Sequence, residues 1–243
     1  AGSTVTVADG FDFTGAITNA TTNEGTLTLS GTTTVSGAVG STGAGLQVIN
    51  AGATGKTATF SSDVTTTLMS TNGSGNIILN GNFTGVLDIT SANAATITLA
   101  DGKNFTGTIT NAASDQGTLN VAGTSTFSGD IGSTTAGLNA VNIQGSDKTA
   151  TFAGDLKATT TTISNLATLK FTKAATTVTG SLTTSGTTGI IDVGTTTVTA
   201  SGTITFGSNA TFNVTIGDSN GQIDATTAGA TLAAGTTVVP TID

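Results

Sequence analysis

Large apolar residues recur along the chain in a five-residue motif that is apolar at its first and fifth positions. The motif reads Phe or Val, then Ser, Thr or Ala, then Gly or Ser, then any residue, then Ile, Val or Leu, and its copies lie 22 to 26 residues apart. The copies begin at Phe13, Val35, Phe60, Phe83, Phe105, Phe127, Phe152 and Val178. Because side chains alternate between the two sides of a strand, the motif predicts a short strand that buries both of its ends.

A second short apolar segment precedes many of these motifs, as at Leu27–Leu29, Ile77–Leu79, Leu119–Val121 and Leu169–Phe171. Clusters of Gly, Asn and Asp separate the segments, and no segment has helical periodicity over the length of a helix. An antiparallel sandwich also has short strands and turns, but it does not repeat one motif at nearly constant spacing. We therefore predict an all-β fold, a parallel β-solenoid (right-handed β-helix) of about ten coils of 22 to 26 residues, roughly 45–50 Å long.

A longer repeat encloses the short one, since residues 4–64 match residues 96–156 without a gap. Roughly half of the aligned residues are identical, among them the string KTATF at Lys56–Phe60 and Lys148–Phe152. Four short steps make up the 92-residue shift, so we expect one domain over residues 1–243, with less regular coils over 190–243. We also expect an internal ladder of aromatic rings interrupted by Val35 and Val178, formed by Phe13, Phe60, Phe83, Phe105, Phe127 and Phe152.

Composition narrows the chemistry that this chain can perform. It has no His, Cys, Trp, Tyr or Arg, and 14 acidic residues against 6 lysines give a formal net charge of -8. An imidazole base, a thiolate nucleophile and an ordinary zinc or haem site are excluded, and a nucleic-acid partner is not expected. No apolar run has the length of a transmembrane segment. We expect a protein that is not an enzyme and has no organic cofactor.

One polar cluster has the spacing of a metal-binding loop. Asp218, Asn220, Gln222 and Asp224 place oxygen-bearing side chains at alternate positions, as calcium loops do. The Gly does not stand where an EF-hand requires it, and no bidentate Glu follows. Calcium binding and a solvated turn therefore both remain open for this segment.

Threonine pairs suggest a further alternative. Thr-x-Thr pairs precede the motif at Thr32/Thr34, Thr57/Thr59, Thr124/Thr126 and Thr149/Thr151. Flat threonine ladders on a solenoid are typical of ice-binding surfaces, although threonine is also common on any outer β face. The coils that start at Phe13, Phe83 and Phe105 carry Asp12, Asn82 and Asn104 instead, so we expect the ladder to be broken.

Three stretches resemble a known family of bacterial surface proteins. They are FSGDIGSTTAGLNAVNI (Phe127–Ile143), Lys157–Thr160 and VTGSL (Val178–Leu182), and they look like the repeated passenger region of rickettsial outer-membrane protein B. The resemblance extends over most of residues 4–190. It implies an autotransporter passenger that forms a surface layer, and some members of that family are adhesins. The chain lacks the alternating aromatic strands of the family's membrane barrel, so we expect a passenger fragment, a cleaved passenger or a separately secreted surface-layer protein.

These observations favour a secreted structural protein of a bacterial surface. The chain opens Ala1-Gly2-Ser3, as after removal of a signal peptide, which fits an extracellular or cell-surface location. Open strand edges at Thr4–Val7 and Thr236–Val239 would allow self-association, with Pro240 blunting the second edge. The alternatives are an adhesin that binds a host protein or glycan through loops between coils, and an ice-binding protein.

Overall fold

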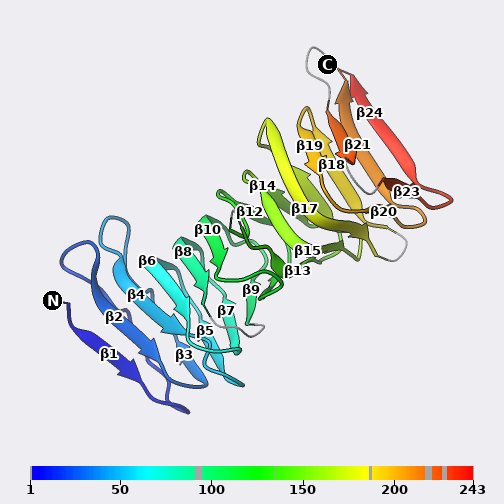
Figure 1. The fold of residues 1–243 in the computed structure, drawn as a ribbon. Coiled ribbons are helices and arrows are strands. Elements are labelled where there is room, and N and C mark those ends of the chain that lie inside the picture. The colour runs from blue at the N-terminus through cyan, green and yellow to red at the C-terminus, as the bar shows by residue number, and fades with distance from the viewer. Residues whose placement is uncertain are drawn as a thin grey trace.

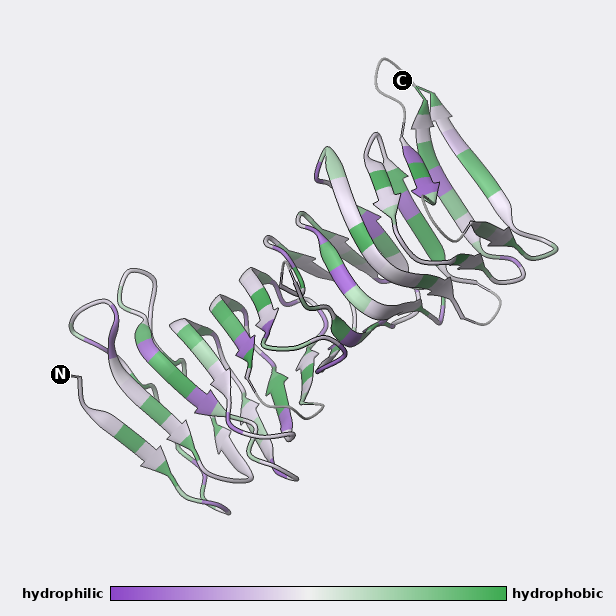
Figure 2. Ribbon diagram, viewed as in Figure 1, coloured by the Kyte–Doolittle hydropathy of each residue, from purple (hydrophilic) through white to green (hydrophobic). Residues whose placement is uncertain are grey.

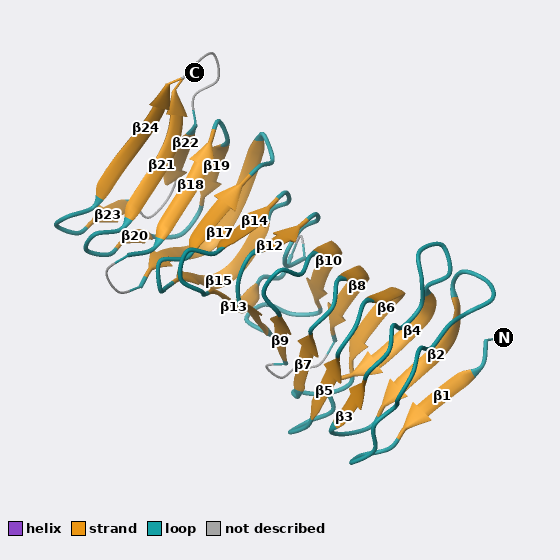
Figure 3. Ribbon diagram, turned by 180° about the vertical axis from the view of Figure 1, so that it is seen from behind, coloured by secondary structure: helices purple, strands orange, loops and turns teal. Residues whose placement is uncertain are grey.

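A computed structural model describes residues 2–90, 95–133, 135–185, 188–216, 221–225 and 229–242. These residues form strands joined by turns, and no helix occurs among them (Figure 3). The strands are β1 (Thr4–Val7), β2 (Glu24–Leu29), β3 (Thr33–Val35), β4 (Leu46–Ala51), β5 (Thr57–Phe60), β6 (Val64–Thr71), β7 (Asn76–Leu79), β8 (Phe83–Ile89), β9 (Thr96–Leu99), β10 (Phe105–Asn111), β11 (Thr118–Val121), β12 (Ser125–Phe127), β13 (Leu138–Ile143), β14 (Thr149–Phe152), β15 (Leu156–Ile163), β16 (Thr168–Phe171), β17 (Ala175–Thr184), β18 (Ile190–Gly194), β19 (Thr197–Ala200), β20 (Ile204–Phe206), β21 (Thr211–Ile216), β22 (Gln222–Ala225), β23 (Ala230–Leu232) and β24 (Thr237–Ile242).

The chain winds into a rod in which each coil lies on the one before it (Figure 1). Every ladder between the described strands is parallel, which confirms the predicted parallel β-solenoid. One column of stacked residues runs through the whole rod: Val5, Leu27, Ile49, Met69, Leu87, Ile109, Ile131, Leu156, Val178, Ala200 and Ala225. These eleven levels are ten coils apart, which gives a length of about 48 Å at the spacing of neighbouring strands.

Three such columns define three faces of the rod. Face C is the column that runs from Val5 to Ala225. Face A carries Phe13, Val35, Phe60, Leu79, Leu99, Val121, Ile143, Ile163 and Thr184. Face B carries Ile17, Val39, Val64, Phe83, Phe105, Phe127, Phe152 and Phe171. Most of these side chains are fully buried and belong to one continuous apolar core. Along many strands of the rod, hydrophobic residues alternate with more polar ones (Figure 2).

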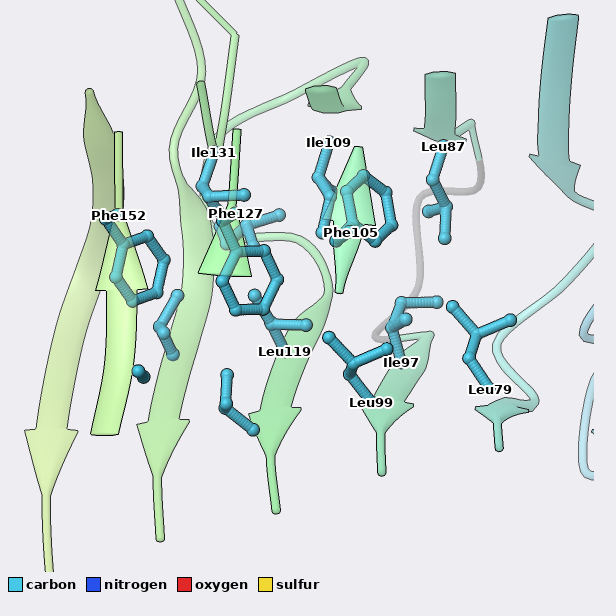
Figure 4. Close-up of a cluster of buried hydrophobic side chains, with 14 of the residues drawn as sticks. Leu79, Leu87, Ile97, Leu99, Phe105, Ile109, Leu119, Phe127, Ile131 and Phe152 are labelled. Atoms are coloured by element: carbon cyan, nitrogen blue, oxygen red, sulfur yellow. The ribbon is translucent and has the colours of Figure 1, made fainter. Parts of the chain in front are cut away.

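The aromatic ladder forms on face B (Figure 4). Phe83, Phe105, Phe127 and Phe152 stack in order, with ring centroids 4.5, 5.9 and 4.7 Å apart and interplanar angles of 8 to 22°. Phe171 continues the column at 6.5 Å with a tilted ring. Stacking of this kind stabilises the core beyond the contribution of burying each ring.

The predicted ladder was wrong at four positions: Phe13, Val35, Phe60 and Val178. Phe13, Val35 and Phe60 form a separate column on face A, where the next level is Leu79. The coil from Phe60 to Leu79 has 19 residues, fewer than the predicted 22 to 26, because the next stacked strand is β7 rather than the strand that begins at Phe83. Phe83 instead stacks on Val64, and in the same way Val178 stacks on Leu156 of face C.

The shorter coils change what the 92-residue repeat means in space. Phe13 lies on face A, but its repeat equivalent Phe105 lies on face B. Likewise Val64 lies on face B and its equivalent Leu156 on face C. The 92-residue shift therefore moves a residue by four coils along the rod and by one further face around it. The spacing alone suggested a shift of four whole coils. Each feature of residues 4–64 recurs in residues 96–156 on the next face of the rod.

Glycines allow the chain to turn between faces B and C. Gly85 and Gly107 stand at this corner on consecutive coils, with φ of 144° and 131°. A Cβ on Gly107 would lie 1.9 Å from the carbonyl oxygen of Gly85, so both the backbone angle and the close approach exclude a side chain. This constraint explains why the third position of the motif is small.

Candidate functional site

Polar side chains join successive coils at the edge of face B. Before Val64, Phe83 and Phe105, the side-chain oxygen of the preceding residue accepts a hydrogen bond from a backbone N–H one coil later. Asp63 Oδ1 accepts from Asn82 N at 2.8 Å, Asn82 Oδ1 from Asn104 N at 3.0 Å, and Asn104 Oδ1 from Thr126 N at 3.0 Å. Asn82 and Asn104 are therefore links between coils, and they lie on a different face from Thr34 and Thr59.

Two repeat-equivalent ion pairs each span three coils. Asp9 Oδ1 accepts from Thr32 N at 2.8 Å, while its Oδ2 accepts from Lys56 Nζ at 2.5 Å. The hydrogen bond from Lys56 holds the pKa of Asp9 below its usual value, and the Thr32 N–H acts in the same direction. Asp101 and Lys148 repeat this arrangement at 2.7 Å, and the hydrogen bond from Lys148 likewise lowers the pKa of Asp101.

A third pair lies on the edge of face C. Lys173 Nζ donates to Asp155 Oδ1 at 2.8 Å, and Thr177 N donates to the same oxygen at 2.9 Å. Partial burial acts to raise the pKa of Asp155, but the hydrogen bonds from Lys173 and Thr177 outweigh it, and the pKa is lowered. The hydrogen bond to Asp155 raises the pKa of Lys173. Each of these carboxylates is thus engaged in holding coils together.

The structure describes two of the four residues that were predicted to bind calcium. Asp218 and Asn220 lie outside the described residues. Gln222 and Asp224 are exposed at alternate positions of β22, so their side chains share the outer side of face C at the last level. Within the described part of the chain, no three acidic side chains gather closely enough to hold a metal ion. Calcium binding at this segment stays a prediction.

The outer side of face A is the most uniform surface of the rod. Outward residues of this face stack in one column: Thr34, Thr59, Ile78, Thr98, Asn120, Asn142, Thr162, Thr183, Thr205 and Thr231. A second column lies two residues earlier: Thr57, Asn76, Thr96, Thr118, Ala140, Thr160 and Ser181. None of these described positions is charged, whereas face B carries the Lys170–Asp192 pair and face C carries Asp88.

The predicted threonine pairs are divided between two faces. Thr32/Thr34 and Thr57/Thr59 belong to face A, but Thr124/Thr126 and Thr149/Thr151 belong to face B, since the repeat moves by one face. Asn82 and Asn104 stand in the face B column with Thr126 and Thr151, so they interrupt that ladder as expected, but they do not interrupt the ladder on face A. Asp12 does precede Thr34 on face A, where its Oδ1 accepts from Thr34 N at 2.7 Å. Sequence spacing missed the pairs Thr96/Thr98 and Thr160/Thr162, which extend face A.

The two ends of the rod carry the predicted edge strands. β1 pairs with β2 alone among the described strands, and β24 pairs with β21 alone. Thr237 N donates to Ala210 O, so the backbone N of Pro240, an odd number of residues later, points away from β21. Pro240 thus leaves one donor missing on the open edge of β24, as edge-strand prolines do.

Comparisons with known proteins do not place the chain in a family. No family model, no curated protein and no solved structure matches it. Among the described residues, no helix is long and apolar enough to cross a membrane.

Proposed function

We propose that this chain is a non-enzymatic structural protein of a bacterial surface, a stiff rod within a coat or a passenger stalk. The observation that carries the proposal is the core column that continues through eleven levels from Val5 to Ala225. A chain of this design gains length with every coil and has no hinge between separate cores, since each level rests on the one before it. Length and stiffness are what a coat or stalk requires.

The cross-links between levels support the same role. Stacked rings on face B, carboxylate and amide links at the corners, and Lys–Asp pairs that span three coils all oppose the separation of neighbouring coils. The exterior is dominated by Thr, Ser and Asn, which keep the rod hydrated with few charges. The resemblance to a surface-layer passenger and the export-compatible composition support an extracellular location.

Antibody labelling of intact cells of the source organism tests this proposal. We expect labelling of unbroken cells, loss of the label after brief protease treatment, and a thinner surface layer in electron cryotomograms of a deletion strain. A strain that is complemented with the wild-type chain is the control. Labelling that appears only after the cells are lysed would overturn the surface assignment.

Face A supports ice binding as a second candidate function. The face presents mainly Thr hydroxyl and methyl groups on a parallel sheet, with successive levels about 4.8 Å apart. Branching at Cβ restricts the threonine rotamers, so the array is ordered before it meets a ligand. Apart from Asp12 at the first level, the array is uncharged, and it suits ordered water better than a glycan, because the chain has no Trp or Tyr on which a sugar ring can stack.

Thermal hysteresis distinguishes this candidate from a purely structural role. Thr98→Lys places a charge in the middle of face A, and Thr110→Lys is the matched control, since both threonines belong to outward Thr-Ile-Thr triplets but Thr110 lies on face C. Ice binding predicts hysteresis in the wild type and in Thr110→Lys, and its loss in Thr98→Lys. Absence of hysteresis in the wild type at high concentration would eliminate the candidate.

A further inference from the structure

Charged side chains are distributed unevenly around the rod. Face B carries Asp63 and the Lys170–Asp192 pair, and face C carries Asp88 and Lys157. The two outward columns of face A hold ten and seven described positions, and none of these positions is charged. Covering a charged side chain that gains no partner is costly, and the chain has a net charge of -8. Face A is therefore the side on which a second copy meets the lowest electrostatic cost.

Ion pairs border face A on both sides. Lys56 and Asp9 stand at the corner between faces C and A, and Lys148 and Asp101 at the corner between faces A and B. Their side chains are 41–47% exposed, so they can stay hydrated while the centre of the face is covered. An uncharged centre with a polar and solvated rim is the usual arrangement of an interface between proteins.

Face A is also long and regular enough for a contact between two rods. The ladders from β5 to β13 on this face run without a register shift. Outward side chains stand about 4.8 Å apart along the rod and about 6.7 Å apart along a strand, so each covers about 32 Å². The two columns then cover about 540 Å² on one copy and about 1,100 Å² on two. A specific contact needs about 1,000 Å² in total, so the face suffices for a weak pairing.

The side chains of face A can make this contact without much loss of freedom. Threonine offers a methyl group for packing and a hydroxyl group that hydrogen-bonds directly or through water, and its branched Cβ restricts its rotamers. Ile78 adds a large apolar side chain between Thr59 and Thr98 in the same column. The two columns hold no Trp, Tyr or Arg, the anchors of strong interfaces, because the chain has none. We therefore expect reversible association.

Asp12 distinguishes between the two possible directions of the paired rods. It stands directly before Phe13 at the first level of face A, where its Oδ1 accepts from Thr34 N. Rods that run in the same direction would bring the two Asp12 carboxylates together, whereas opposite directions separate them along the rods. We propose that two copies of this chain pair side by side through face A, with their rods antiparallel. The inference rests on the proposed coat, because it supplies a lateral contact between rods.

Sedimentation velocity of the 243-residue chain over a range of concentrations tests the pairing. Thr98→Lys places a charge in the middle of face A, and Thr110→Lys on face C is the matched control. We expect dimers of the wild type and of Thr110→Lys as the concentration rises. Thr98→Lys should dimerise at least about tenfold more weakly, because each dimer would cover two unpaired ammonium groups. Circular dichroism establishes that both variants keep their β structure.

A single spin label on each copy tests the direction of the rods. Phe11→Cys offers an attachment point outside the two columns of face A, since Phe11 is 67% exposed in the turn before Asp12 and the chain has no other Cys. Any distance measured by pulsed electron paramagnetic resonance then lies between two copies. Antiparallel rods place the labels at opposite ends of the dimer, about 48 Å apart along the rods. A distance below about half of that value would overturn the antiparallel arrangement.

Three further results would overturn the pairing itself. One is a wild type that stays monomeric at every concentration, and another is a Thr98→Lys variant that dimerises as strongly as Thr110→Lys. The third is a monomeric wild type with thermal hysteresis, which would assign face A to ice instead. Labelling of intact cells does not depend on any of these results, so failure of the pairing and failure of the surface role are distinguishable.

Discussion

Replacement of Phe127 by alanine removes the middle ring of the face B stack. Phe127 is fully buried, and its ring centroid lies 5.9 Å from that of Phe105 and 4.7 Å from that of Phe152. Since every level rests on the levels before and after it, the cavity left by the ring borders both neighbouring coils. The site has little freedom to collapse, because both neighbours are held by their own ladders.

The cost of this change follows from burial and stacking together. Removal of a buried Phe side chain destabilises a protein by about 3–5 kcal/mol, which includes the cavity term. Loss of two stacked ring pairs, each worth about 0.5–1.5 kcal/mol beyond burial, favours the upper half of that range. Phe127→Leu keeps most of the apolar volume and should cost less than about 1.5 kcal/mol.

Urea unfolding followed by far-UV circular dichroism measures the difference, since the chain has no Trp or Tyr for fluorescence. Phe11→Ala is the matched control: Phe11 is 67% exposed, and its loss should change the free energy of unfolding by no more than about 0.5 kcal/mol. If Phe127→Ala costs less than about 1 kcal/mol, or no more than Phe11→Ala, then the stacked column does not support the rod as described.

Further predictions concern a corner glycine and the partly buried Asp155–Lys173 ion pair. Gly107→Ala should destabilise the chain by about 3 kcal/mol or more in urea unfolding, because its Cβ meets the Gly85 carbonyl. The control Gly102→Ala should cost about 1 kcal/mol, since Gly102 also has a positive φ but a Cβ there meets open space. Equal costs for the two variants would contradict the close approach. The pKa of Asp155 is lowered in the folded chain, so its contribution is present above about pH 4 and is lost as the pH falls through the lowered pKa. Asp155→Asn should therefore be less stable than the wild type at pH 7 and show a weaker loss of stability on acidification, and identical pH profiles for the two proteins would refute this role.

The fold was predictable from the sequence because one motif repeats with strand periodicity. The five-residue motif requires a buried residue at each end, and a parallel stack is the arrangement in which all copies satisfy that requirement at once. The order of the stack was harder to predict, because coil length varies. Thr57–Phe60 and Asn76–Leu79 both have an apolar residue at the second position and a large apolar residue at the fourth, and both bury these two positions. This likeness is the signal by which the 19-residue coil could have been recognised.

The candidate surfaces were predictable only in part, for the same reason. Spacing along the chain does not reveal on which face a residue lies once coils differ in length, so threonines of two faces were assigned to one ladder. The links between coils had a signal that spacing analysis overlooked: an Asp or Asn recurs directly before the first apolar residue of a motif, as in Asp12, Asn82 and Asn104.

The central claim is that every coil adds one level to a straight stack, and distances between spin labels test it most directly. Thr34, Asn120 and Thr205 lie in one outward column of face A, with four levels between the first pair and eight between the first and last. The chain has no Cys, so the labelled variants Thr34→Cys/Asn120→Cys and Thr34→Cys/Thr205→Cys are unambiguous. Pulsed electron paramagnetic resonance should give distances of about 19 Å and about 38 Å, in a ratio of one to two. Distances that do not grow with the number of levels would contradict the solenoid.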